Sequence, residues 1–130
     1  MAEKVVVISE KTPKAIGPYS LAIEASGFIF VSGQLGIDAI HEELVPGGVD
    51  KETRKALENM SSALQAAGSD LSNVVKTTVF LKDINDFSKM NAVYAEFFTS
   101  KPPARSAFQV AALPKGASVE IEAIALSGQD

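Results

Sequence analysis

Two carboxylates and one arginine near the end of the sequence occupy positions where a core pattern would place apolar residues. Glu120 and Glu122 lie inside an apolar run from Ser118 to Leu126, and Arg105 opens an earlier apolar segment. Read as a strand, the run places both glutamates on one face, about 7 Å apart. Glu is uncommon in strands, and two negative charges this close lower the stability of the fold unless a nearby cation compensates them. The pattern predicts a cation close to these two carboxylates.

Arg105 is the natural candidate for that cation. Strand alternation puts it on one face with Ala107 and Gln109. A guanidinium can bind a carboxylate through two parallel hydrogen bonds, and the small Ala107 leaves room beside it. Two interpretations stay open from spacing alone. Arg105 forms a salt bridge with Glu120 or Glu122 across adjacent strands, or it holds the carboxylate of a small ligand.

The composition limits the classes of protein to consider. A length of 130 residues suits a single domain, residues 1–130, which can bury roughly two thirds of its unfolded surface. The formal net charge is −4 and the 12 basic residues are dispersed, whereas nucleic-acid surfaces cluster Lys and Arg. No apolar run approaches the ~20 residues that span a membrane. We therefore expect no nucleic-acid partner and no membrane association.

Neither a metal nor a cofactor is expected. Cysteine is absent, so disulfides, thiol chemistry and zinc–thiolate sites are excluded. His41, the only histidine, is followed by Glu42-Glu43 in a polar stretch that lacks the further ligands of a metal site. Gly47-Gly48 lacks the preceding strand and following Lys of a phosphate loop. Residues 1–4 lack the pattern of a secretory signal, which predicts a cytoplasmic location.

The first third of the chain predicts strands joined by a long loop and a tight turn. Residues 4–9 read as a first strand, and Pro and Gly residues make 10–19 a loop. Residues 21–25 and 28–32 flank Ser26-Gly27, which is typical of a two-residue hairpin. We expect 33–48 to be mostly loop with at most a short strand.

The remaining chain predicts two helices and three strands. Asp50 is the expected N-cap of a helix that ends at Gly68, and a second helix begins at about Asp86 and ends before Pro102-Pro103. A central strand covers 74–82, and two strands follow the second helix. The strand at 74–82 should present Val75, Thr77, Val79 and Leu81 on one side, and the second helix should bury Phe87, Met90, Tyr94 and Phe97.

This order of elements predicts an α+β fold of two layers. One mostly antiparallel sheet carries both helices on a single face. The opposite face keeps apolar residues that the helices cannot cover. Self-association is the expected way to bury them.

Six motifs in register identify a resemblance to the reactive intermediate deaminase family, also called the RidA/YjgF family. The resemblance runs nearly end to end. The motifs are Ala15-Ile16-Gly17-Pro18-Tyr19, Ser32-Gly33-Gln34, Val75-Lys76-Thr77-Thr78-Val79-Phe80-Leu81 with Asp83 and Asp86-Phe87, Asn91-Ala92-Val93-Tyr94, Pro103-Ala104-Arg105-Ser106, and Leu113-Pro114-Lys115 followed by Glu120-Ile121-Glu122-Ala123-Ile124-Ala125. It implies a chorismate-mutase-like fold, a homotrimer with ligand pockets between subunits, and hydrolysis of 2-iminobutanoate and 2-iminopropanoate to 2-keto acids and ammonia.

The resemblance also implies roles for particular residues. Arg105 matches the arginine that binds the substrate carboxylate, and Glu120 matches the acidic residue assigned to the catalytic water. The positions expected to line the pocket are Tyr19, Ser32, Gly33, Phe87, Asn91 and Ala107. Many members carry Cys where this chain has Ala107, so thiol-dependent chemistry is excluded here, although imine hydrolysis needs no thiol.

Plainer roles stay open for these residues. Tyr19 could only anchor its loop, Ser32-Gly33 could be an ordinary turn, and Phe87 could belong to the core. Two other functions also stay open. The chain could be a trimeric regulator that binds a small carboxylate without turning it over, or a ribonuclease and translation inhibitor, which the acidic charge balance disfavours.

Overall fold

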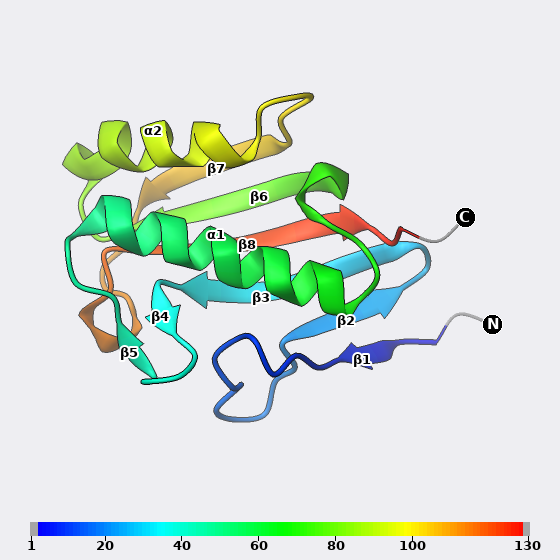
Figure 1. Ribbon diagram of the computed structural model, residues 1–130. Coiled ribbons are helices and arrows are strands. Elements are labelled where there is room, and N and C mark those ends of the chain that lie inside the picture. The colour runs from blue at the N-terminus through cyan, green and yellow to red at the C-terminus, as the bar shows by residue number, and fades with distance from the viewer. Residues whose placement is uncertain (1–2, 129–130) are drawn as a thin grey trace.

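The computed structural model describes residues 3–128 as a sheet covered on one face by two helices (Figure 1). The main sheet contains β1 (Val5–Val7), β2 (Ala22–Ala25), β3 (Phe28–Leu35), β6 (Val74–Leu81), β7 (Ala104–Gln109) and β8 (Val119–Leu126). The helices are α1 (Val49–Ala66) and α2 (Phe87–Phe97). A two-stranded sheet is formed by β4 (Ile37–Asp38) and β5 (Glu43–Leu44), and short 3-10 turns cover Leu71–Asn73, Ile84–Asp86 and Pro114–Gly116.

The strand order confirms the predicted two-layer α+β architecture. The sheet runs β1-β2-β3-β8-β6-β7, and every neighbouring pair is antiparallel except β6 and β7. These two strands are parallel because α2 carries the chain back across the sheet between them. Strand β7 ends the sheet order, so within residues 3–128 one of its edges pairs with no other strand, and α2 lies above it.

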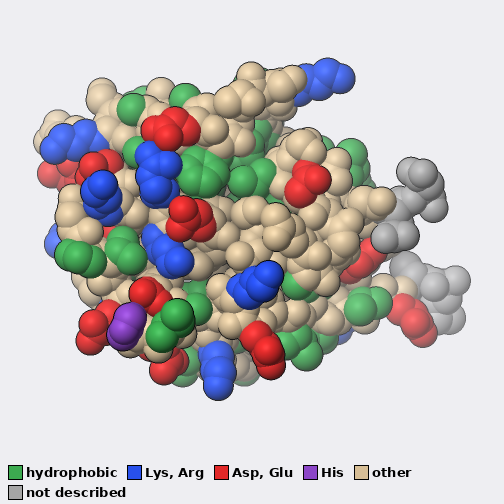
Figure 2. All heavy atoms as spheres, viewed as in Figure 1, with side chains coloured by type: hydrophobic (Ala, Val, Ile, Leu, Met, Phe, Trp, Pro, Cys, Tyr) green, Lys and Arg blue, Asp and Glu red, His purple; other side chains and the backbone are tan. Residues whose placement is uncertain are grey.

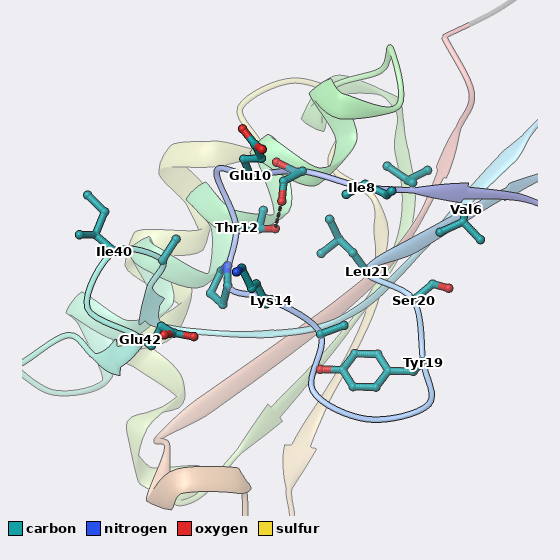
Figure 3. Close-up of a pocket in the computed structure, with 15 residues that line it drawn as sticks. Val6, Ile8, Glu10, Thr12, Lys14, Tyr19, Ser20, Leu21, Ile40 and Glu42 are labelled. Atoms are coloured by element: carbon teal, nitrogen blue, oxygen red, sulfur yellow. Dashed lines mark hydrogen bonds between the residues drawn. The ribbon is translucent and has the colours of Figure 1, made fainter.

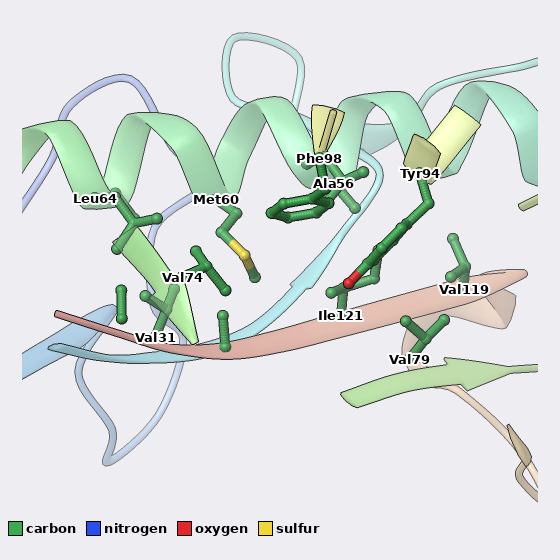
Figure 4. Close-up of a cluster of buried hydrophobic side chains, with 14 of the residues drawn as sticks. Val31, Ala56, Met60, Leu64, Val74, Val79, Tyr94, Phe98, Val119 and Ile121 are labelled. Atoms are coloured by element: carbon green, nitrogen blue, oxygen red, sulfur yellow. The ribbon is translucent and has the colours of Figure 1, made fainter. Parts of the chain in front are cut away.

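The core lies between the helices and the sheet (Figure 4). Leu57, Met60 and Leu64 project from one face of α1 and are fully buried. Strand alternation supplies the other side, since Val119, Ile121, Ala123 and Ala125 of β8 are buried while the residues between them are not. The prediction that Glu120 and Glu122 share the opposite face of β8 is therefore confirmed.

The predicted hairpin is confirmed, and so is its turn chemistry. Ser26 and Gly27 join β2 to β3 with φ angles of 53° and 84°. Both angles lie in the left-handed region that a two-residue hairpin of the observed twist requires. The region 33–48 contains more strand than expected, because β3 continues to Leu35 and is followed by β4 and β5.

Two details of the predicted helices are wrong. Asp50 does not cap α1, since the N-cap position is Gly48 and no side chain closes it; Asp50 lies in the first turn, where the helix dipole favours a negative charge. In α2 the buried residues are Met90, Val93 and Tyr94, while Phe87 and Phe97 are only partly buried.

The uncovered face of the sheet is apolar, as predicted, but the strand at 74–82 does not place Val75 on the same side as Thr77, Val79 and Leu81. The register shifts between Val74 and Lys76, so Val74 faces the core and Val75 is exposed. Strand pairing instead gathers aromatic and aliphatic side chains on the face away from the helices. These are Ile23, Phe28, Phe30, Phe80, Phe108, Ile124 and Leu126, of which Phe30 is 44 % exposed and Phe108 45 %.

Charges on the helix-bearing side are mixed in sign. Figure 2 shows basic and acidic side chains interspersed over this face, without a basic patch. Within residues 3–128 neither helix has the length and apolar character needed to cross a bilayer.

Candidate functional site

Arg105 lies on the helix-facing side of the edge strand β7, beneath α2. Its Nη1 donates a hydrogen bond of 2.7 Å to Oδ1 of Asn91. The guanidinium carbon is 5.4 Å from the ring centroid of Phe87 and 4.7 Å from that of Tyr94. Phe87, Asn91 and Tyr94 are four and three residues apart, so they form one stripe along the helix. The helix thus holds the guanidinium through one amide and two aromatic faces.

The guanidinium has hydrogen-bonding capacity left over. It is half-buried, yet among residues 3–128 it forms no ion pair and no hydrogen bond other than that to Asn91. A cation partly removed from water is stable only when an anion or several acceptors compensate it. The free N–H groups of Arg105 therefore suit a ligand carboxylate bound through two parallel bonds, with Ala107 leaving space on the same face.

Glu120 lies in a separate place, at the start of β8 on the face away from the helices. Its side chain is half-buried, whereas Glu122 is exposed. Burial raises the pKa of the Glu120 carboxyl, and the negative charge of Glu122 raises this pKa further. A carboxylate with a raised pKa is a better proton acceptor than an ordinary surface glutamate. The difference in burial separates two residues that strand alternation alone could not distinguish.

A bulge in β3 makes room for this carboxylate. The pairing of β3 with β8 shifts between Val31 and Gln34, which leaves Ser32 and Gly33 outside the ladder. A Cβ at Gly33 would lie 2.8 Å from Cδ of Glu120, so only glycine leaves the carboxylate in place. Ser32 uses its hydroxyl locally, since Oγ donates to the carbonyl of Ser20 at 2.6 Å. This bond fastens the loop before β2 to the bulge.

Tyr19 completes the Glu120 group. It lines a hollow of about 150 Å³ together with Gly33, Pro114 and Glu120. The residue is 54 % exposed, so it is not a buried loop anchor. Figure 3 shows Tyr19 also at the edge of a larger hollow of about 740 Å³, between the loop from Ile8 to Leu21 and the segment with Ile40 and Glu42. Neither Arg105 nor Glu120 lines this larger hollow.

The interpretation that Arg105 forms a salt bridge with Glu120 or Glu122, which residue spacing allowed, is wrong. Strand β6 lies between β7 and β8, and the two ends of the proposed pair are on opposite faces of the sheet. Arg105 pairs with Thr77, which is fully buried under the helices, whereas Glu120 pairs with Phe80 on the uncovered face. The candidate residues therefore form two groups. We call Arg105, Phe87, Asn91 and Ala107 the arginine half-site, and Glu120, Gly33, Ser32 and Tyr19 the glutamate half-site.

One residue that contacts the arginine half-site was missed by sequence reasoning. Tyr94 was expected only in the core, and it is buried, but its ring also lies against the guanidinium. Its spacing of three residues from Asn91 and seven from Phe87 is the signal that could have identified it. Among residues 3–128, no group of three or more His, Cys, Asp or Glu side chains is placed to hold a metal ion.

Comparisons with known proteins agree on a family. The model of the family described as "Endoribonuclease L-PSP" matches residues 9–127. A relative from Bos taurus, named 2-iminobutanoate/2-iminopropanoate deaminase, is 56 % identical over 123 residues, covering 95 % of this chain and 90 % of the relative. The structure of a Rid family protein from Yersinia pestis superimposes with a TM-score of 0.93 at 44 % identity, covering 95 % of this chain and 99 % of the other. That of TdcF from E. coli with bound serine has a TM-score of 0.90 at 38 % identity, covering 94 % and 98 %.

Proposed function

Since the chain belongs to the endoribonuclease L-PSP family, also called the YjgF/RidA family, we propose that it is an imine deaminase. It hydrolyses reactive 2-imino acids such as 2-iminobutanoate and 2-iminopropanoate to the 2-keto acid and ammonia. The observation that carries this proposal is Arg105, a half-buried guanidinium held by Asn91 with N–H groups left free. A 2-imino acid supplies the carboxylate that such a group binds.

Bound serine in the related TdcF structure supports a ligand of this size and charge. Serine shares with a 2-imino acid a carboxylate and a nitrogen on the adjacent carbon. In this chain the arginine half-site would orient the carboxylate, and Phe87 and Ala107 would border the rest of the molecule. A fixed carboxylate places the imine carbon in one position, which lowers the entropy loss of the reaction.

Glu120 acts as the general base toward the attacking water. The water oxygen bonds to the imine carbon, and the proton it loses passes to the Glu120 carboxylate. The electrons of the broken C=N π bond move to the nitrogen, and Glu120 returns the proton to it, which gives a carbinolamine. Glu120 then takes the hydroxyl proton as the C=O bond forms and delivers it to the nitrogen as the C–N bond breaks, so ammonia leaves. One water is consumed and one ammonia released, so Glu120 ends in its starting state. The raised pKa of Glu120 suits a group that both accepts and returns a proton.

The two half-sites act together only between subunits. Arg105 and Glu120 lie on opposite faces of the sheet, so one chain cannot direct both onto the same small ligand. A closed homotrimer brings the arginine half-site of one subunit against the glutamate half-site of the next. Two features of the single chain support association: the apolar uncovered face and the open edge of β7, both of which another subunit can cover.

The function is tested by supplying the imine directly. A pyridoxal-phosphate dehydratase acting on threonine or serine releases the 2-imino acid, which also hydrolyses unaided in water. A catalytic amount of this protein should accelerate formation of the 2-keto acid, and an equal amount of Arg105→Ala should not. Binding of pyruvate without acceleration would instead support the regulator. RNA cleavage by the wild-type protein but not by Arg105→Ala would support the ribonuclease.

Assembly is tested by a charge on the uncovered face. Phe30 lies there beside Ile124, so Phe30→Lys should prevent subunits from associating, because burying an unpaired ammonium is unfavourable. Sedimentation equilibrium should give a trimer for the wild-type protein and a folded monomer without activity for the variant. Gln65→Lys, on the exposed side of α1, adds the same charge and should stay an active trimer. A fully active Phe30→Lys monomer would contradict the shared site.

A further inference from the structure

Beneath Arg105 lies a buried hydrogen bond that the proposed chemistry does not use. Thr77 of β6 is the residue paired with Arg105 of β7, and both point toward α2. Oγ1 of Thr77 is 2.7 Å from Oη of Tyr94, and both side chains are almost completely buried. Replacing both partners of such a pair by apolar side chains of the same shape can be nearly neutral or stabilising, so stability alone does not explain why the pair is present.

This bond fixes the position of the Tyr94 ring. Figure 4 shows Tyr94 extending from α2 toward the sheet, next to Phe98. The ring centroids of Tyr94 and Phe98 are 4.6 Å apart, so the phenol is held at its hydroxyl by Thr77 and along its face by Phe98. Burial raises the pKa of Tyr94, so the phenol keeps its proton at neutral pH. The ring is thereby a rigid and uncharged platform.

The guanidinium of Arg105 rests on this platform, since its carbon is 4.7 Å from the Tyr94 centroid. Within residues 3–128 the guanidinium of Arg105 forms a single hydrogen bond, to Asn91. One hydrogen bond fixes a point on the guanidinium but leaves its plane free to turn. Contact with an aromatic face restricts that plane, because a cation is attracted to the ring and its flat group stacks on it.

We infer that Tyr94, anchored by Thr77, is a positioning residue that sets the plane of the Arg105 guanidinium for binding a carboxylate. The inference rests on the proposed function only in naming a 2-keto or 2-imino acid as the carboxylate. Asn91 and Tyr94 then have complementary roles. The Asn91 amide oxygen accepts a hydrogen bond from one N–H of Arg105, and the Tyr94 ring orients the remaining N–H groups toward the ligand. Tyr94 itself does not touch the ligand.

The test compares a variant that removes the ring with one that keeps it. Tyr94→Met fills much of the space but has no aromatic face, whereas the pair Tyr94→Phe and Thr77→Val keeps the ring and removes both hydroxyls. We expect Tyr94→Met to raise the Kd for pyruvate, measured by calorimetry, and the KM for the imine by about tenfold. The Phe/Val pair keeps the ring but loses the bond that fixes it, so we expect a smaller increase of about threefold, with the fold retained because both buried partners are removed together.

A second arm separates positioning from simple packing. In an Arg105→Ala background, Tyr94→Met should cause no further loss of pyruvate affinity, since the ring acts through the guanidinium. A purely structural Tyr94 would lower Tm and leave the Kd of the folded protein unchanged. That result, or the same affinity loss with and without Arg105, would overturn the inference.

The wild-type protein also provides a test that does not require Tyr94→Met to fold. In the NMR spectrum the Nε–H signal of Arg105, assigned with Arg105→Lys, should be shifted by the ring currents of Tyr94 and Phe87, and the shift that remains in Phe87→Leu is the part due to Tyr94. A signal at the position of a freely rotating arginine would contradict the inference even if Tyr94→Met failed to fold. Because this signal and pyruvate binding do not require turnover, a failure to hydrolyse imines would be recognised separately as a failure of the proposed function.

Discussion

Arg105→Ala is expected to abolish most of the enzyme-dependent hydrolysis of 2-imino acids while leaving the fold intact. Removing one partner of a partly buried charge pair costs about 3 kcal/mol or more, which corresponds to a fall in kcat/KM of about 10²-fold or more. The fold should tolerate the change because Arg105 is on an edge strand and its guanidinium, which contacts the stripe of α2, is only half-buried. Keto-acid formation measured above the uncatalysed background checks the prediction.

Arg105→Lys is the informative companion variant. Lysine keeps the charge but cannot form two parallel bonds or stack flat on Tyr94, so an intermediate loss of about tenfold is expected. Circular dichroism and sedimentation should show both variants folded and assembled. Activity of Arg105→Ala equal to that of the wild-type protein would eliminate the proposed role of the guanidinium.

Glu120→Gln should lower kcat by about 10²-fold or more and leave KM nearly unchanged. The amide keeps the shape of the carboxylate, so the space beside Gly33 stays filled, but it cannot accept a proton from water. Glu122→Gln is the matched control, since it removes the same charge two residues away on the same face. It should retain kcat within about threefold. If Glu122→Gln lowered kcat more than Glu120→Gln, Glu122 rather than Glu120 would be the residue that accepts the proton from water.

The pH dependence provides a second check on Glu120. The carboxyl must be ionised to accept a proton, so kcat should fall as the pH is lowered through its raised pKa. Glu122→Gln removes one cause of the increase, so the acidic limb of its profile should move to lower pH, by less than about one unit. A limb that moved to higher pH, or that persisted unchanged in Glu120→Gln, would assign it to another group.

Strand alternation and turn chemistry were sufficient to predict most of the fold. The hairpin at Ser26-Gly27 and the two faces of β8 follow from local rules, because φ preferences and the period of two act on each residue separately. The prediction that Asp50 caps α1 was wrong because Asp50 is a good N-cap by residue type alone, whereas the N-cap position is taken by Gly48. The predicted side for Val75 was wrong because one extra residue in a bulge reverses the side on which the preceding strand residues lie.

The site could be predicted only in part. Arg105 and the two glutamates could be identified as candidates because their charges stand out against apolar strands, and the family resemblance then selected Glu120 over Glu122. Their mutual placement could not be predicted, because it depends on β6 lying between β7 and β8, a long-range pairing that no local pattern encodes. The contact between Tyr94 and Arg105 was hidden for a related reason: an aromatic residue in a helical stripe looks the same whether it packs on a core or on a cation.

The central claim is that each active site takes Arg105 from one subunit and Glu120 from another, and mixed assemblies test it most directly. Arg105→Ala and Glu120→Gln subunits, each nearly inactive alone, are mixed in equal amounts, dissociated and reassembled. In a closed ring, random mixing pairs an intact Arg105 with an intact Glu120 at about a quarter of the sites. Reassembly should therefore restore about a quarter of the wild-type activity. Activity no higher than the average of the two parents would place both residues in one chain's site and contradict the account.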